Sequence, residues 1–199
     1  MLKVGLTGGI GSGKTMVSRI FEALGIAVYN SDMRAKLLMN TDPELQSALQ
    51  NCFGSDIYDN DGNLNRPKLA EIIFNDPESL EKVNNCVHPA VFHDFNHWCA
   101  LQNSPYIIEE SAIIFERNIA HQFGKVILVT APEYVRIKRV CIRDGITPEA
   151  VQERMANQWT DDKKKPLADY IINNDNLRSL TPQIMEIHKQ LMFIIHNGF

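Results

Sequence analysis

Gly8-Gly9-Ile10-Gly11-Ser12-Gly13-Lys14-Thr15, close to the start of the chain, matches the pattern G-x-x-x-x-G-K-[ST]. A short apolar run at residues 2–6 precedes it, and apolar residues at helical spacing follow it from Val17 to Leu24. A strand, a glycine-rich loop and a helix in this order are the context in which the pattern marks a phosphate-binding loop. The sequence therefore predicts that this loop binds a nucleoside triphosphate.

The residue types of the loop suit a polyphosphate for physical reasons. Glycine lets the backbone curl until successive N–H groups point at phosphate oxygens, and the following helix directs its positive N-terminal end at the same anion. Lys14 would reach the β- and γ-phosphates, and the hydroxyl of Thr15 would bind Mg²⁺. Met16 offers only a backbone N–H, which we expect to contact the α-phosphate. The predicted nucleotide-binding residues of the loop are Gly9, Gly11, Ser12, Gly13, Lys14, Thr15 and Met16.

The composition indicates one folded domain. Of the 199 residues, 44% are hydrophobic, and the net charge of −4 argues against a partner chosen by bulk electrostatics, such as nucleic acid. No apolar run approaches the roughly 20 residues that span a bilayer, and the glycine-rich loop begins too early for a signal peptide. The four cysteines lack metal-ligand spacing and are expected to be reduced, mostly buried thiols. We therefore expect a cytoplasmic protein without a membrane partner, either a monomer or a weak homo-oligomer.

Five strand-like runs alternate with helical patterns, at residues 2–6, 26–29, 105–110, 126–129 and 168–174. Strands joined in this way form a right-handed, parallel, doubly wound sheet. The sequence thus predicts an α/β fold in a single domain of residues 1–199, with a five-stranded parallel sheet and a core of about 1–32, 104–138 and 167–199. We expect residues 33–103 to form a helical insertion that binds a phosphoryl acceptor, and residues 139–166 to form a lid.

Asp32 follows directly on the second predicted strand. Ligands of open α/β sheets bind at the carboxyl ends of the strands, which places this carboxylate near the bound phosphates. There it could orient and deprotonate an attacking hydroxyl. The alternative is that Asp32 only caps a helix at residues 33–39. The glycine-rich loop upstream favours the catalytic interpretation.

The predicted insertion contains two helix starts and a His-Pro pair. Asp42 and Asp76, each followed by proline, predict helix starts. His88-Pro89 is expected to separate two helices, with His88 either a structural hydrogen-bond partner or a functional group.

After the insertion, the Glu109-Glu110 pair at the end of the third strand could support Mg²⁺ or contact the acceptor, or could be solvated loop acids.

Basic residues gather between positions 136 and 154. Arg139 and Arg143 are four residues apart and share a helix face, so two guanidinium groups could bind polyphosphate and stabilise charge in the transition state. The alternative is a solvated basic face. Thr147-Pro148 predicts the start of the next helix. Residues 161–166 look like the polar return loop of a lid that excludes water.

Taken together, these motifs resemble those of dephospho-CoA kinase, a family of P-loop kinases, over nearly the full length of the chain. The resemblance lies in residues 6–14, in Asp32 after the second strand and in the His88-Pro89 pair. The lid and the last strand follow the family's pattern at Arg143-Asp144-Gly145, Arg154, Gln158, Lys164 and residues 168–174. Three positions depart from it: Met16 stands where threonine is usual, Asn30 replaces an acid and Ala112 replaces a proline.

The resemblance implies ATP-dependent phosphorylation of the ribose 3′-hydroxyl of dephospho-CoA, giving CoA and ADP, with Mg²⁺. It implies catalytic roles for Asp32, Lys14 and Arg143, and ATP contacts from Arg139 and Arg143 in addition to the loop. The implied acceptor-binding residues are Asp32, Lys36, His88, Arg154 and Gln158.

Other functions share part of these signals. The loop chemistry alone also fits a kinase for another nucleotide-like acceptor, such as a nucleoside monophosphate, but Asp32, His88 and the lid motifs favour dephospho-CoA. A GTPase switch would need an N-K-x-D segment, which the sequence lacks. A nucleotide sensor without turnover would carry the same loop.

Overall fold

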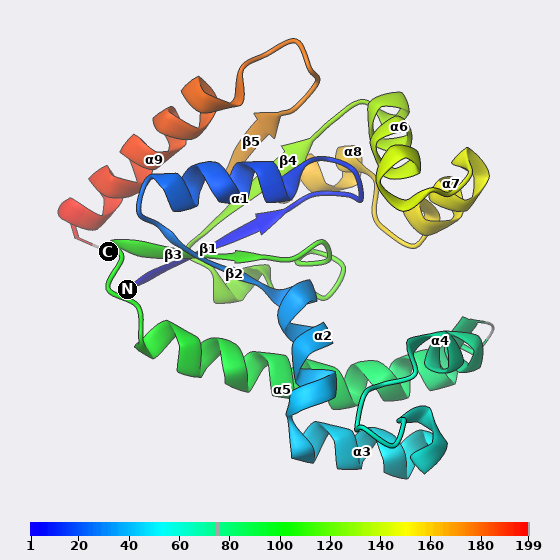
Figure 1. Ribbon diagram of the computed structural model, residues 1–199. Coiled ribbons are helices and arrows are strands. Elements are labelled where there is room, and N and C mark those ends of the chain that lie inside the picture. The colour runs from blue at the N-terminus through cyan, green and yellow to red at the C-terminus, as the bar shows by residue number, and fades with distance from the viewer. Residues whose placement is uncertain (75, 199) are drawn as a thin grey trace. The chain divides into compact units, whose positions relative to one another are not determined.

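The structure is a computed structural model that describes residues 1–74 and 76–198, and the chain separates into two compact units (Figure 1). The first unit joins residues 1–30 to the part of the chain that begins at Gln102. The second unit spans Ser31–Leu101.

A five-stranded sheet forms the centre of the first unit. Its strands are β1 (Leu2–Thr7), β2 (Ala27–Asn30), β3 (Tyr106–Glu110), β4 (Lys125–Thr130) and β5 (Tyr170–Asn173). All neighbours are parallel, in the order β2-β3-β1-β4-β5. The predicted parallel α/β sheet is confirmed. Because β1 lies between β3 and β4, the loop that follows β1 begins at the middle of the sheet's carboxyl edge.

Helices of the first unit connect and cover these strands. They are α1 (Lys14–Ala23), α6 (Glu133–Asp144), α7 (Pro148–Ala156), α8 (Asp161–Lys164) and α9 (Leu180–His196), with 3₁₀ turns η2 (Ala120–Gln122) and η3 (Lys165–Leu167). Figure 1 shows α1 and α9 side by side along one face of the sheet, and the two helices are in contact.

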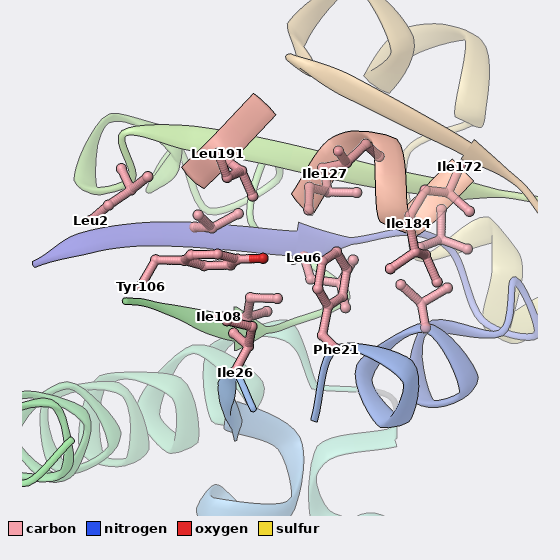
Figure 2. Close-up of a cluster of buried hydrophobic side chains, with 14 residues drawn as sticks. Leu2, Leu6, Phe21, Ile26, Tyr106, Ile108, Ile127, Ile172, Ile184 and Leu191 are labelled. Atoms are coloured by element: carbon pink, nitrogen blue, oxygen red, sulfur yellow. The ribbon is translucent and has the colours of Figure 1, made fainter. Parts of the chain in front are cut away.

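The main hydrophobic cluster lies between these two helices and the sheet (Figure 2). Alternate residues of a strand point to the same face, so every second residue of β1 enters this cluster. Phe21 from α1 and Leu191 from α9 are completely buried against them. On the opposite face, Val126 packs with Ile114, Phe115 and Phe123 from the segment after β3. The sheet is therefore buried on both faces, which accounts for its apolar strands.

The second unit consists mainly of helices: α2 (Ser31–Thr41), α3 (Pro43–Phe53), the 3₁₀ turn η1 (Ser55–Ile57), α4 (Arg66–Phe74) and α5 (Pro77–Ala100). The helix starts predicted at Asp42 and Asp76 are confirmed, because each carboxylate accepts hydrogen bonds from two N–H groups of the following turn. The start predicted at Thr147 in the first unit is confirmed in the same way, by the N–H of Ala150.

The prediction that His88-Pro89 separates two helices is wrong. Helix α5 continues through Pro89, although proline provides no N–H for the carbonyl of Asn85 and disfavours a helix interior. Val83, Val87, Val91 and Phe95 form a buried stripe on both sides of the proline, and α5 packs against α2, α3 and α4. We attribute the continuity to this packing, which offsets the cost of one lost hydrogen bond.

Two expectations from composition can be compared with the structure. Within the described residues, no helix is long and apolar enough to cross a membrane. The four cysteines are free thiols, but the expectation that most are buried is wrong: Cys52 is exposed, and Cys86, Cys99 and Cys141 are half-buried.

We predict that His188 makes the stability of the first unit pH-dependent. Its Nδ1 lies 2.8 Å from the Tyr106 hydroxyl, and partial burial lowers the pKa of His188. As pH falls below about 6.5, the unfolded chain binds a proton before the folded chain does, so the free energy of unfolding decreases until the folded His188 is also protonated. Urea unfolding between about pH 7.5 and 5.5 should show this decrease in the wild type and a smaller one in His188→Asn.

His121→Asn is the matched control, because this histidine is exposed. It should keep the wild-type pH dependence. An equal decrease in all three proteins would contradict the assignment to His188.

Candidate active site

The glycine-rich loop, residues 8–13, connects β1 to α1 in the first unit. Its backbone takes left-handed conformations at Gly11 (φ 77°) and Gly13 (φ 95°), which side-chain-bearing residues rarely adopt. A Cβ atom on Gly11 would also lie 2.6 Å from the carbonyl oxygen of Arg136. Glycine at this position therefore satisfies two constraints, the backbone angle and the close approach of α6.

Three consecutive carbonyl groups of the loop accept hydrogen bonds from cationic or amide side chains. The Ile10 oxygen accepts from Arg136 Nε at 2.9 Å. The oxygens of Gly11 and Ser12 each accept from Arg139 Nη1 at 3.3 Å, and Ser12 also accepts from Asn174 Nδ2 at 2.8 Å. These donors come from α6 and from the residue after β5. By holding the carbonyl groups, they fix the peptide planes of the loop and hence the directions of its N–H groups.

The start of α1 provides the donors expected for an anion. Gly13 is the N-cap and has no side chain to cap the first turn, where helices leave N–H groups without intrahelical partners. Lys14 Nζ donates to the carbonyl oxygen of Gly8 at 2.9 Å, so its ammonium group lies beside the loop. Thr15 and Met16 are exposed. These four residues thus combine a cation, a hydroxyl and backbone donors at one helix N-terminus.

The residues present fit Mg²⁺. Thr15 offers a hard, exposed hydroxyl oxygen, and Mg²⁺ commonly takes few protein ligands, with water and phosphate oxygens completing its shell. In the part of the chain that the structure describes, no cluster of three or more His, Cys, Asp or Glu residues could hold a metal by itself, so phosphate oxygens would have to contribute.

Glu109 and Glu110 are both buried, so the interpretation as solvated loop acids is wrong. Glu110 Oε2 accepts a hydrogen bond from Ser18 Oγ at 2.7 Å, which joins β3 to α1 one turn after Lys14. Glu109 interacts electrostatically with Arg117, whose pKa is lowered mainly by burial.

The lid arginines of the sequence prediction occupy different surroundings. Arg139 contacts the glycine-rich loop and, through Nη2, both the backbone and side-chain oxygens of Asn174 at 3.1 Å. Arg143 and Arg154, each more than half exposed, both bind the carboxylate of Asp144. Hydrogen bonding from Arg143 is the main cause that lowers the pKa of Asp144. The structure thus brings Arg143 and Arg154 together through one carboxylate.

Asp32, Lys36 and His88 belong to the second unit. Asp32 is the second residue of α2, which begins at Ser31, so the alternative in which Asp32 only caps a helix at residues 33–39 is wrong. Lys36 lies four residues later on the same helix face, and both side chains are exposed. His88 is half-buried in α5, next to Pro89.

Sequence reasoning missed contacts made by buried polar groups. Arg136 is 7% exposed and was not assigned a role. Its spacing of three from Arg139 is the signal that places both on one face of α6. The polar return loop expected at residues 161–166 is instead α8 followed by η3, and Lys164 within it is fully buried. Gln158, predicted to bind the acceptor, accepts a hydrogen bond from Ile10 N at 2.8 Å.

Known proteins are similar in sequence to this chain along nearly its whole length. The family model for dephospho-CoA kinase matches residues 2–179. Dephospho-CoA kinase of Porphyromonas gingivalis is 42% identical over 188 residues, which cover 94% of this chain and 93% of that protein. The chain belongs to the dephospho-CoA kinase family. Dephospho-CoA kinase of Bacteroides fragilis is 35% identical, with 98% of this chain and 95% of that protein covered.

A solved structure has the same fold as this chain. The crystal structure of TT1252 from Thermus thermophilus superposes with a TM-score of 0.83 at 26% identity, covering 96% of each chain. None of these relatives favours the alternative of a nucleoside monophosphate kinase. Each of the two family relatives bears the name of the family that the motifs resemble.

We predict that Gly11→Ala weakens ATP binding about tenfold or more, because the new Cβ meets the Arg136 carbonyl and the φ of 77° is strained. Isothermal titration calorimetry would measure the dissociation constant. Gly25→Ala is the matched control, since Gly25 has a φ of 80° but nothing within 4 Å of a Cβ. If both variants lost the same affinity, backbone strain alone would explain the effect and the contact with α6 would be irrelevant.

Proposed function

We propose that the protein transfers the γ-phosphoryl group of ATP to the ribose 3′-hydroxyl of dephospho-CoA, giving CoA and ADP in the last step of CoA biosynthesis. The observation that carries this conclusion is the family match over residues 2–179, which includes the glycine-rich loop. The loop supplies the donor site that any such kinase requires.

The donor half of the site lies at the N-terminus of α1. Backbone N–H groups of the loop and of the first helical turn bind the phosphates, and Lys14 neutralises charge on the β- and γ-oxygens. Thr15 would hold Mg²⁺, and the ion would supply further neutralisation of the phosphate charge. Because the donors are fixed before the reaction, they stabilise the transferring group without reorganising.

Asp32 orients the attacking hydroxyl and accepts its proton as the new oxygen–phosphorus bond forms. The bond between the γ-phosphorus and the bridging oxygen breaks in line, and ADP leaves. Residues 33–103 form the acceptor-binding insertion in this proposal, with Lys36 and His88 contacting dephospho-CoA. The exposed pair Asp32 and Lys36 on one face of α2 supports this role.

Residues 139–166 act as the lid, whose exposed part around Arg143 and Arg154 moves while residues 158–164 stay tied to the segment after β3. Arg143, which shares Asp144 with Arg154, exchanges this carboxylate for substrate phosphate when the lid closes. Its exposure and its planar fork of donors suit that exchange. Arg154 then contacts the acceptor, and Arg139, which donates to the loop from α6, acts beside the donor phosphates.

The reaction belongs in the cytoplasm, where ATP is plentiful and thiols stay reduced. The free cysteines are compatible with this location. We propose a monomer or a weak homo-oligomer as the active form.

The direct test is ADP release from ATP and Mg²⁺ with dephospho-CoA, compared with AMP, CMP, UMP and adenosine, together with mass spectrometry of the acceptor. We expect rapid release with dephospho-CoA alone and an acceptor heavier by one phosphoryl group. Turnover on a nucleoside monophosphate without turnover on dephospho-CoA would overturn the acceptor assignment. ATP binding without any acceptor-dependent release would indicate a nucleotide sensor.

We predict that Asp32→Asn lowers kcat about 100-fold or more, because the amide cannot accept the proton, while the dissociation constant for ATP changes little. Steady-state kinetics and calorimetry would measure the two quantities. Asp61→Asn removes another exposed carboxylate of the second unit and should leave kcat unchanged. A comparable loss of ATP affinity in Asp32→Asn would instead assign Asp32 to the metal site.

A further inference from the structure

The peptide groups of Ile10 are held by side chains from two distant segments. Its N–H donates to Gln158 Oε1 at 2.8 Å, across 148 positions of sequence. Its carbonyl oxygen accepts from Arg136 Nε at 2.9 Å, and the same guanidinium group forms an ion pair with Asp161 at 3.5 Å. Gln158 and Asp161 therefore reach one residue of the glycine-rich loop, the first directly and the second through Arg136.

We propose that Gln158 is a positioning residue for the donor site: its side-chain oxygen holds the Ile10 N–H and thereby sets the conformation in which the loop receives the phosphates of ATP. This inference rests on the proposed binding of ATP at the loop. It departs from the family resemblance, which implies that Gln158 contacts the acceptor.

The segment that carries Gln158 is anchored well enough to act in this way. The N–H of the next residue, Trp159, donates to Glu116 Oε1 at 2.9 Å. The same oxygen lies 2.7 Å from Nζ of Lys164, a fully buried lysine that also donates to the carbonyl of Ala112 at 3.1 Å. Lys163 lies over the ring of Trp159, 3.5 Å from its centroid. Residues 158–164 are thus tied to the segment after β3.

Lys164 and Glu116, whose side chains are 0% and 13% exposed, are costly to separate, because each would leave an uncompensated charge in a poorly solvated site. The Lys164–Glu116 pair therefore resists displacement of residues 158–164. Because the neighbouring Trp159 is anchored to Glu116, Gln158 is held in place as well. Its side-chain oxygen is therefore a preformed hydrogen-bond acceptor for the loop. A preformed contact costs little conformational entropy when ATP binds.

The hydrogen bond of Gln158 engages none of the predicted phosphate donors. The N–H groups assigned to phosphate belong to Gly9 and to residues 11–16, and Ile10 is not among them. Holding Ile10 at both its N–H and its carbonyl fixes the peptide planes on each side of it, and the next plane leads into the left-handed Gly11. The contact thus orients the donors that follow without competing for them.

The test uses full-length protein with three variants and separate calorimetric titrations of ATP·Mg²⁺ and dephospho-CoA. Gln158→Leu removes the hydrogen-bond acceptor and keeps a side chain of similar size. Gln158→Glu keeps an acceptor oxygen but adds a negative charge, and Asn157→Asp adds the same charge on the exposed neighbouring residue. Comparing the last two variants isolates the hydrogen bond from the charge.

We expect Gln158→Leu to raise the dissociation constant for ATP by about threefold to tenfold, because ATP must then order the loop that Gln158 no longer holds, and to leave that for dephospho-CoA unchanged. Gln158→Glu should bind ATP as Asn157→Asp does. Because Gln158→Leu loses one intramolecular hydrogen bond, its midpoint of thermal unfolding should fall by about 2–4 °C, and the other two variants should keep the wild-type midpoint.

Three results would overturn the inference. The first is a selective loss of dephospho-CoA affinity in Gln158→Leu, which would make Gln158 an acceptor contact. The second is unchanged ATP affinity in that variant. The third is weaker ATP binding in Gln158→Glu than in Asn157→Asp. Failure of the wild type to bind ATP would instead refute the proposed function, so the two failures can be told apart.

Discussion

The outward direction of three consecutive carbonyl groups, those of Ile10, Gly11 and Ser12, is the constraint on which the candidate site depends. A loop that binds polyphosphate must turn its N–H groups toward the anion, so its oxygens must find donors on the other side. Arg136, Arg139 and Asn174 provide these donors. Arg136 and Arg139 come from α6 and Asn174 from the end of β5, elements that the parallel sheet brings to the carboxyl edge beside β1. The sheet order thus explains why a loop near residue 10 is held by residues near 140 and 174.

Much of the fold could be predicted because its signals are local. Buried parallel strands read as continuous apolar runs. Two helices of the second unit, α3 and α5, begin where an aspartate precedes a proline. The glycine-rich loop was identified with its flanking strand and helix, since its chemistry allows few other residues at Gly11 and Lys14. The family assignment followed from motifs spread over the chain, which the comparisons with known proteins then supported over residues 2–179.

The remainder could not be predicted because it depends on tertiary packing. Pro89 predicts a helix break by every local rule, yet α5 continues because a buried stripe holds the helix on both sides. Lys164 lies in a run of charged residues that looks solvated, and only the fold shows the carboxylate of Glu116 that receives it. Arg136 looks like its basic neighbours in the sequence, and only the fold shows that it is buried against the Ile10 carbonyl. In each case a residue's role is set by a partner far away in the sequence.

The most direct test of this account is a crystal structure with a non-hydrolysable ATP analogue and Mg²⁺. We expect phosphate oxygens within hydrogen-bond distance, about 3 Å, of N–H groups between Gly11 and Met16. We also expect Arg136 still to bind the Ile10 carbonyl and Arg139 the Gly11 carbonyl. Phosphates bound away from the loop, or loop carbonyls that turn inward and release both arginines, would contradict it.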